Sequence, residues 1–297
     1  MTYTSVHTSK EGSGIMEPIK IGSTIPAEKI HYLIEKFSFK KSLDIDYEDY
    51  RDRFVYSFSL NREAFSDIAL YNGLANFVID IMLNFYAEGF IRRRVNKLFK
   101  DLRGVDKSQV VEEAYQILLD KKQLKDEKDR LKNEVLDFLI EHNCLIIDGF
   151  IIFRPRSLNN LADKAIEKAM ERLYLLLEYR DYIETLRLFI DTQYSQMEVV
   201  NLVVSDEGIQ LLDPFNNKIN NEEIKYILEE IFEEEISESD IILSSLLTLA
   251  PKNIIVHGNA DNSDLLVLLK EIFKGRIHDC IGCEVCLIES IVVKNKS

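Results

Sequence analysis

Residues 69–90 read ALYNGLANFVIDIMLNFYAEGF, the longest apolar stretch of the chain. It is long enough to span a bilayer, but polar residues interrupt it at steps of four, namely Asn72, Asn76, Asp80, Asn84 and Glu88. Because each charge near a bilayer centre costs about 2.5–3.5 kcal/mol on insertion scales, we expect no transmembrane helix here. Steps of four place the polar residues on one side of a helix. The stretch predicts a mostly buried helix with a solvent-facing stripe; a hydrogen-bonded polar seam lining a groove is the alternative.

The chain around this helix, residues 62–192, predicts a mostly helical domain. Long helices are indicated near 62–101, 107–142 and 157–191. In the second, apolar residues recur every seven positions, whereas the other seam position includes Lys121 and Lys128. A seam with a thin, cationic centre favours a helical hairpin within the chain or a dimerisation stalk over a full coiled coil.

Residues 144–153, CLIIDGFIIF, separate the second and third of these helices. Two apolar runs flank Asp148-Gly149, which is the strongest short signal for a tight turn between strands. We therefore expect a β-hairpin near 144–154. Pro155 would end its second strand, and Ser157 or Asn160 would cap the third helix.

The regions on both sides of the helical domain mix strands with helices. In 1–61 we expect strands at 15–21 and 53–60 and a helix from Pro26 to about Phe39. In 193–297 we expect strands at 199–204, 210–212, 253–257 and 276–279, and helices at 222–232, 240–249 and 263–273. Alternating strands and helices indicate some parallel pairing. The fold class is α+β: a small N-terminal α/β region, a long mostly helical middle with a β-hairpin, and an acidic C-terminal α/β module.

The composition is that of a soluble globular protein of about two domains. The 297 residues are 46% hydrophobic and 30% charged, with four cysteines and a net charge of −14. So few cysteines do not make a disulfide scaffold. The acidity disfavours nucleic acid, because nonspecific binding to phosphates needs clustered cations. The N-terminus lacks a basic segment followed by an apolar core, so we expect a cytoplasmic protein with reduced thiols.

The acidic excess lies mainly in the last third of the chain. Residues 193–297 hold 19 acidic and 8 basic residues, which account for −11 of the net charge. Much of it comes from Glu229, Glu230, Glu233, Glu234, Glu235, Glu238 and Asp240. A solvated surface explains this run, and docking of a protein partner is the alternative.

The most specific chemical feature is HDCIGCEVC at residues 278–286. Two-residue spacing lets Cys280, Cys283 and Cys286 turn back onto one centre, and Gly282 eases the tight loop. Thiolates suit zinc and iron–sulfur clusters, and a closed tetrahedral zinc site needs a fourth ligand.

Three residues are candidates for that fourth ligand. His278 is the nearest in sequence, and His257 could reach the cysteines if its strand lies beside the last one. Cys144 is a distant candidate. Zinc is the expected ion and an iron–sulfur cluster the less favoured cofactor, because a fourth cysteine and a proline do not follow Cys286 as in a bacterial ferredoxin run. Redox-active thiols and purely structural cysteines are the other interpretations.

Catalytic motifs do not appear in the chain. It lacks G-x-x-x-x-G-K-[ST], G-x-G-x-x-G, H-E-x-x-H and G-x-S-x-G, so we lean towards a protein that is not an enzyme. A run of three arginines, Arg92–Arg94, ends the first long helix. Cations there complement the helix dipole, and contact with an anion, a membrane surface or RNA is the sharper alternative.

Five stretches together resemble the YtxC-like family of sporulation proteins from endospore-forming bacteria. They are EGFIR at 88–92, DGFIIFR at 148–154, EYRDYI at 178–183, SDIILSSLLTLAPK at 239–252 and CIGCEVC at 280–286. The resemblance implies a sporulation-associated, cytoplasmic bacterial protein and supplies no reaction. With the residue chemistry, it favours a binding or regulatory protein whose cysteines hold zinc. Its partner would be another protein or a second copy, bound through the helical hairpin and the acidic C-terminal face.

Overall fold

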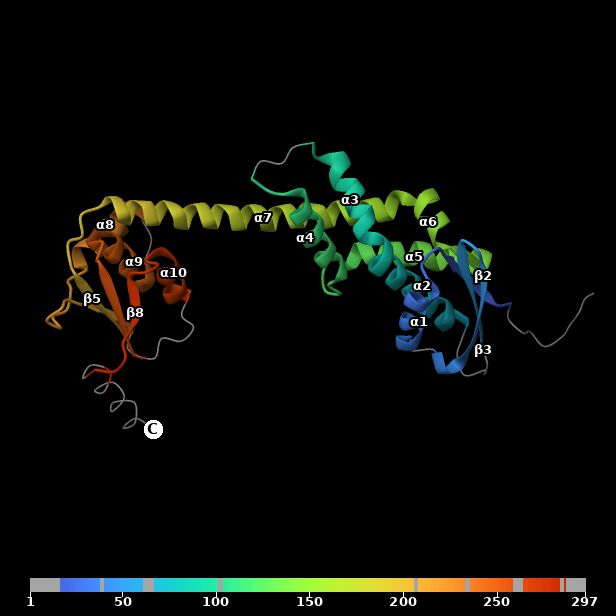
Figure 1. Ribbon diagram of the computed structural model, residues 1–297, viewed down its shortest axis with the longest axis horizontal. Coiled ribbons are helices and arrows are strands. Elements are labelled where there is room, and N and C mark those ends of the chain that lie inside the picture. Colours follow the sequence, from blue (N-terminus) through green and yellow to red (C-terminus); the bar gives the residue numbers. More distant parts are fainter. Residues whose placement is uncertain are drawn as a thin grey trace, which may run out of the picture. The chain divides into compact units, whose positions relative to one another are not determined.

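The computed structural model describes residues 17–37, 40–60, 67–100, 104–205, 208–232, 236–258, 264–283 and 286. The chain divides into two compact units, Met1–Leu175 and Leu176–Ser297 (Figure 1). Each unit contains a four-stranded sheet together with helices, which confirms the predicted α+β class. The chain passes from the first unit to the second within helix α7 (Pro155–Thr192).

The sheet of the first unit has the strand order β2-β3-β1-β4. Its strands are β1 (Ile19–Ser23), β2 (Leu43–Tyr50), β3 (Arg53–Leu60) and β4 (Cys144–Ile146). β1 runs antiparallel to β3 and parallel to β4, so Ile21 lies between Tyr56 and Leu145, all three of them buried. Helix α1 (Ala27–Lys36) directly follows Pro26. The expected strand at 53–60 and the helix after Pro26 are confirmed, while residues 15 and 16 lie outside the described residues.

Strand β2 is an element that the sequence did not lead us to expect. Its residues, LDIDYEDY, alternate, but only Leu43 is buried. β2 lies at an edge of the sheet, where acidic side chains discourage pairing with other chains. Leu43, Ile45 and Tyr47 alternate with acidic residues, which is a strand pattern that the expectations above did not include.

The stretch at 69–90 forms the core of the first unit. It lies in helix α2 (Asp67–Ile81), a π-helical turn η2 (Met82–Tyr86) and helix α3 (Ala87–Leu98). By length and composition, this is the one described helix that could cross a membrane, yet 56% of its most apolar 18-residue window is buried inside the protein. Four of the five polar residues in the series are exposed, namely Asn76, Asp80, Asn84 and Glu88. The predicted core helix with a solvent-facing stripe is confirmed.

The predicted single helix at 107–142 is wrong, because the chain turns at residues 120–124. Helix α4 (Lys107–Leu119) packs on α3, and helix α5 (Lys125–His142) packs on α2. Lys121 lies in the turn, and the Lys128 ammonium donates to the Asp120 carbonyl oxygen at 2.6 Å. The chain therefore reverses at Lys121, one of the two lysines of the seam. The other, Lys128, bonds a carbonyl oxygen at the C-terminal end of α4.

The predicted β-hairpin near 144–154 is also wrong. The three-residue strand β4 pairs with β1, and the chain then forms helix α6 (Ile147–Phe153). Ile147, Phe150 and Ile151 are buried at helical spacing. Asp148 lies in the first turn of α6, where a carboxylate is favourable, instead of in a β-turn.

Helix α7 begins at Pro155, two residues before the predicted start. Proline suits the first helical position because its missing N–H would have no partner there. The expected caps, Ser157 and Asn160, are therefore inside the helix, and the Ser157 hydroxyl instead bonds Glu134. Residues of α7 enter both cores, Leu161 and Ala165 in the first unit and Ile183 and Ile190 in the second.

The sheet of the second unit has the order β6-β5-β7-β8, with β5–β7 and β7–β8 parallel. Its strands are β5 (Val199–Ser205), β6 (Gly208–Leu212), β7 (Asn253–His257) and β8 (Ile277–Asp279). Its further helices are α8 (Glu222–Phe232), α9 (Glu238–Leu249) and α10 (Asp264–Ile272). The predicted strands, helices and parallel pairing are confirmed, although residue 263 lies outside the described part.

Candidate metal centre

The parallel pairing of β7 and β8 brings a histidine and a cysteine together. His257 is the last residue of β7, and Cys280 directly follows β8. The Cys280 N–H donates to the Val256 carbonyl oxygen at 2.9 Å, which extends the ladder by one step. Because carboxyl ends of parallel strands meet at the same edge of a sheet, the two residues become neighbours.

Strand alternation decides which face of the sheet carries the histidine. Val200, Leu202, Ile254 and Val256 belong to the apolar core that the helices cover. His257 follows Val256 and so lies on the opposite face, which it shares with Asn201. It is nevertheless only 5% exposed.

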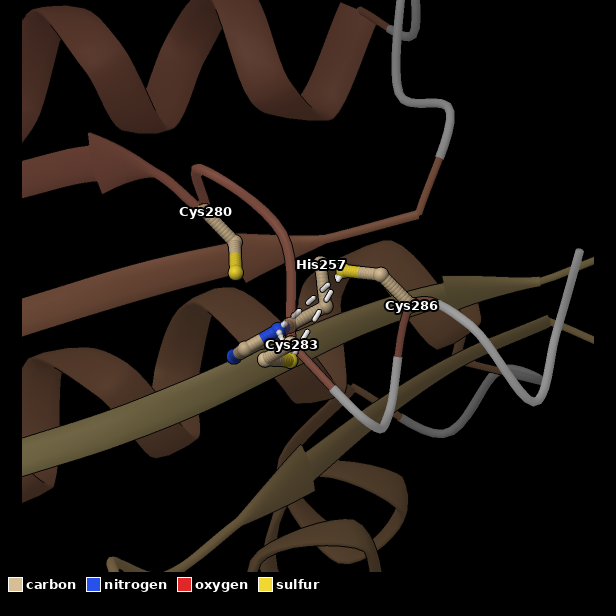
Figure 2. Close-up of side chains that lie close together, drawn as sticks. All are labelled: His257, Cys280, Cys283 and Cys286. Carbon is tan, nitrogen blue, oxygen red and sulfur yellow. Dashed lines mark hydrogen bonds between the residues drawn. The ribbon is translucent and has the colours of Figure 1, made fainter.

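The loop after β8 turns two more thiols towards His257 (Figure 2). Gly282 has a φ of +118°, which a residue with a side chain rarely adopts, and its N–H donates to the Cys280 Sγ at 3.4 Å. His257 Nδ1 lies 3.3 Å from the Cys283 Sγ and 3.6 Å from the Cys286 Sγ. The sulfurs of Cys283 and Cys286 are 3.9 Å apart.

Four donor atoms therefore surround one point. The ligand atoms of His257, Cys280, Cys283 and Cys286 all lie within 4.8 Å of one another. In a tetrahedral site with Zn–S near 2.3 Å and Zn–N near 2.0–2.1 Å, neighbouring ligand atoms are about 3.5–3.8 Å apart. The separations among Nδ1 and two sulfurs are close to these edges. The donor set can hold a metal ion such as zinc.

The protonation chemistry of the group fits a metal ligand set. Burial lowers the pKa of His257, so its ring is neutral at pH 7 and has a free lone pair. At Cys280, the Gly282 N–H lowers the pKa of the thiol. Partial burial and the thiols of Cys283 and Cys286 outweigh this effect, leaving the pKa of Cys280 above its ordinary value. Neighbouring thiols oppose one another's ionisation, and a bound cation would remove that opposition.

The two other candidate ligands do not join this group. His278 lies opposite Ile255 in the β7–β8 register, two residues before Cys280, and is exposed. At about 3.3 Å per residue, this position lies some 6–7 Å back along the strand. Cys144 is exposed on β4 in the first unit.

Asn201 is the neighbour of the site that sequence analysis missed. Its Oδ1 lies 3.1 Å from His257 Nε2. A polar signal was present, since Asn201 interrupts the apolar run VVNLVV at 199–204. That signal cannot identify a partner 56 residues away.

The arginine run, Arg92–Arg94, lies in the middle of α3 and makes contacts inside the first unit. Arg94 forms two hydrogen bonds of 2.6 Å to the carboxylate of Asp163. Arg92 pairs with Glu88 one turn earlier at 2.8 Å, and Arg93 lies over the Phe90 ring. Each of the three side chains thus has a contact within the unit.

The acidic residues of the last third are only partly described. Glu229, Glu230, Glu238 and Asp240 are exposed, whereas Glu233, Glu234 and Glu235 lie outside the described residues. The described members form a solvated surface. Asp240 also bonds the Ser237 hydroxyl at the start of α9.

Comparison with known proteins identifies the family of the chain. A family model, the YtxC-like family, matches residues 72–278, which is more than two thirds of its length. The chain belongs to the YtxC-like family. The match includes His257 and ends just before Cys280, so this YtxC-like chain carries the three cysteines of the candidate site immediately beyond the matched range. Comparisons with curated proteins and with solved structures gave no match.

Proposed function

We propose that this YtxC-like protein is a zinc-binding protein of the binding or regulatory kind. One zinc ion is held by His257, Cys280, Cys283 and Cys286. The convergence of four donor atoms, three thiol sulfurs and one imidazole nitrogen, within 4.8 Å of one another carries this proposal. Zinc accepts thiolate and imidazole ligands in a tetrahedral arrangement, and the separations among the Nδ1 of His257 and the sulfurs of Cys283 and Cys286 are close to the edges of such a site.

The role of the ion in this proposal is structural. A closed set of four protein ligands leaves no position for a substrate, whereas catalytic zinc sites keep one open. The ion would join the loop after β8 to the end of β7, where the Cys280 N–H already bonds the Val256 carbonyl oxygen. Binding energy at such a site becomes folding energy of the loop.

The cellular setting belongs to the same proposal. A cytoplasmic location suits the site, since thiols remain reduced there. The family resemblance supports an association with sporulation, and a protein partner or second copy would bind the acidic C-terminal face or helices α4 and α5. Deleting the gene in an endospore-forming host should lower the yield of heat-resistant spores, and an unchanged yield would contradict the association.

Elemental analysis of protein purified anaerobically without chelator tests the metal proposal. We expect a colourless protein with about one equivalent of zinc. Replacing zinc by cobalt should give the visible absorption of tetrahedral thiolate coordination, lost in Cys283→Ser. Less than about a tenth of an equivalent of zinc, with no uptake of added zinc or cobalt, would overturn the proposal.

A second candidate is a thiol redox site, which the 3.9 Å separation of the Cys283 and Cys286 sulfurs favours, or an iron–sulfur cluster on the same cysteines. Close cysteines can form a disulfide or bind a cluster. A cluster needs ligands on more than one iron, and the short mutual distances fit a single ion better. Iron with a visible chromophore in the anaerobic preparation would favour this candidate over zinc.

A further inference from the structure

Asn201 connects the candidate metal centre to a fixed backbone acceptor. It lies on β5, beside β7 in the sheet. Its amide nitrogen donates to the Asp213 carbonyl oxygen at 3.0 Å, and its Oδ1 lies 3.1 Å from His257 Nε2. The Asn201 side chain therefore touches the site from the side opposite the thiols.

The chemistry of these contacts determines where the imidazole proton lies. A backbone carbonyl can only accept, so the Asn201 NH₂ group must face Asp213. The amide oxygen then faces His257, and because it too can only accept, Nε2 must carry the hydrogen. Nδ1 is left with its lone pair, and Nδ1 is the atom that lies 3.3 Å and 3.6 Å from the sulfurs of Cys283 and Cys286.

The carbonyl that starts this chain of bonds is itself held in place. The Asp213 N–H donates to the Asn217 carbonyl oxygen at 2.9 Å. The Asp213 carboxylate accepts the N–H groups of Phe215 and Asn217 at 2.8 Å and 2.9 Å. The turn after β6 thus fixes the acceptor that orients Asn201.

We propose that Asn201 is the positioning residue of the centre. It holds His257 as the Nε2–H tautomer and aims Nδ1 at the point where the thiols converge. The metal consequence of this role rests on the proposed zinc function, whereas the tautomer does not. Outer partners of a ligating histidine usually change metal affinity by about 10–100-fold when removed.

The first measurement compares zinc affinity, by competition with a chromophoric chelator, in the full-length wild type, Asn201→Leu and Asn253→Leu. Asn253 is the matched control, a half-buried asparagine at the start of β7. We expect Asn201→Leu to bind about 10–100-fold more weakly and the control to bind as the wild type. Equal affinity in all three proteins would overturn the positioning role.

The second measurement detects the tautomer in metal-free protein. Long-range ¹H–¹⁵N NMR of the imidazole should show Nε2–H for His257 in the wild type and in Asn253→Leu. Asn201→Leu should give a mixture with Nδ1–H, a change that a merely structural role would not produce. If Asn201→Leu does not fold, Asn201→Ala removes the amide without adding volume.

The two measurements separate the two claims. A wild type that takes up no metal but shows the Asn201-dependent tautomer would overturn the zinc proposal and support the role of Asn201. A wild type that binds zinc, with an unchanged tautomer in the Asn201 variants, would support the zinc proposal and overturn the role of Asn201.

Discussion

Removal of a single thiol should lower zinc affinity only where that thiol lies at the candidate metal centre. Cys283→Ser replaces a soft thiolate by a hydroxyl and should lower zinc affinity by more than the roughly 10–100-fold typical of outer partners. Cys144→Ser and His278→Ala change residues outside the group of four and should leave the affinity unchanged. Chelator competition measures all three, and an equal loss in His278→Ala would contradict the assignment of His257 as the fourth ligand.

Tyr56 gives a residue-scale prediction for alkaline pH. Burial raises the pKa of Tyr56 to about 12, with smaller effects from Tyr47 and Glu28. The unfolded chain, with a tyrosine pKa near 10, releases this proton first. The stabilising contribution is therefore complete below about pH 10 and is lost as the pH rises towards 12.

Tyr56→Phe should remove this part of the alkaline destabilisation. Urea unfolding at about pH 8 and about pH 11 measures the free energy of unfolding at both ends of the range. We expect a smaller decrease between the two pH values in the variant than in the wild type. An identical decrease would show that the Tyr56 phenol does not titrate differently in the folded and unfolded chains.

The part of the candidate site that depends on short-range spacing, the three cysteines, was predictable from the sequence. The cysteine spacing placed three thiols on one loop, since residues three apart can turn back onto one point. Choosing His257 over His278 required the strand register, which only the folded sheet provides. Asn201 depends on strand order as well, because its partners lie on β7 and after β6.

At the scale of elements, Asp148 joins three parts of the first unit. Its carboxylate accepts the Thr24 N–H at 3.0 Å and the Thr24 hydroxyl at 2.7 Å, both just beyond β1. The Tyr86 hydroxyl in η2 also donates to it at 2.9 Å. The start of α6 is thereby attached to the end of β1 and to the π-helical turn.

Asp148→Ala should destabilise the first unit, because three donors lose their acceptor together. Leaving a partly buried group without its partner costs about 1–3 kcal/mol, which is the expected loss in free energy of unfolding. Asp137→Ala changes an exposed carboxylate of α5 and is the control. Chemical denaturation followed by circular dichroism measures both variants, and equal stabilities would show that water replaces these bonds.

Two elements were misassigned from sequence for reasons that lie in the local signals. Asp-Gly favours a β-turn, but aspartate is equally suited to the first turn of a helix, and the parallel partner of β4 lies more than 120 residues earlier. The break between α4 and α5 contains neither glycine nor proline. Its visible signal was Asp120, whose side chain accepts the Lys122 N–H at 2.9 Å in a local turn.

The whole molecule contains two cores, and the candidate metal centre belongs to only one of them. All four donor residues lie in the unit Leu176–Ser297. A ligand that binds only the folded state stabilises the structure that forms its site, by about 2.7 kcal/mol at a free concentration of 100 times Kd. The stabilisation from zinc should therefore appear in the unfolding of this unit.

Calorimetry of the full chain, with zinc and after chelation, tests whether zinc stabilises only the unit that holds its ligands. We expect chelation to lower the temperature of one transition and to leave the transition of the other unit in place. Hydrogen exchange identifies the affected unit, since protection should fall at β7, β8 and the segment around Cys280, while β1 and α2 keep theirs. Equal losses of protection in both units would mean that the two cores unfold as one cooperative structure, and an unchanged thermogram would contradict a structural role for the metal.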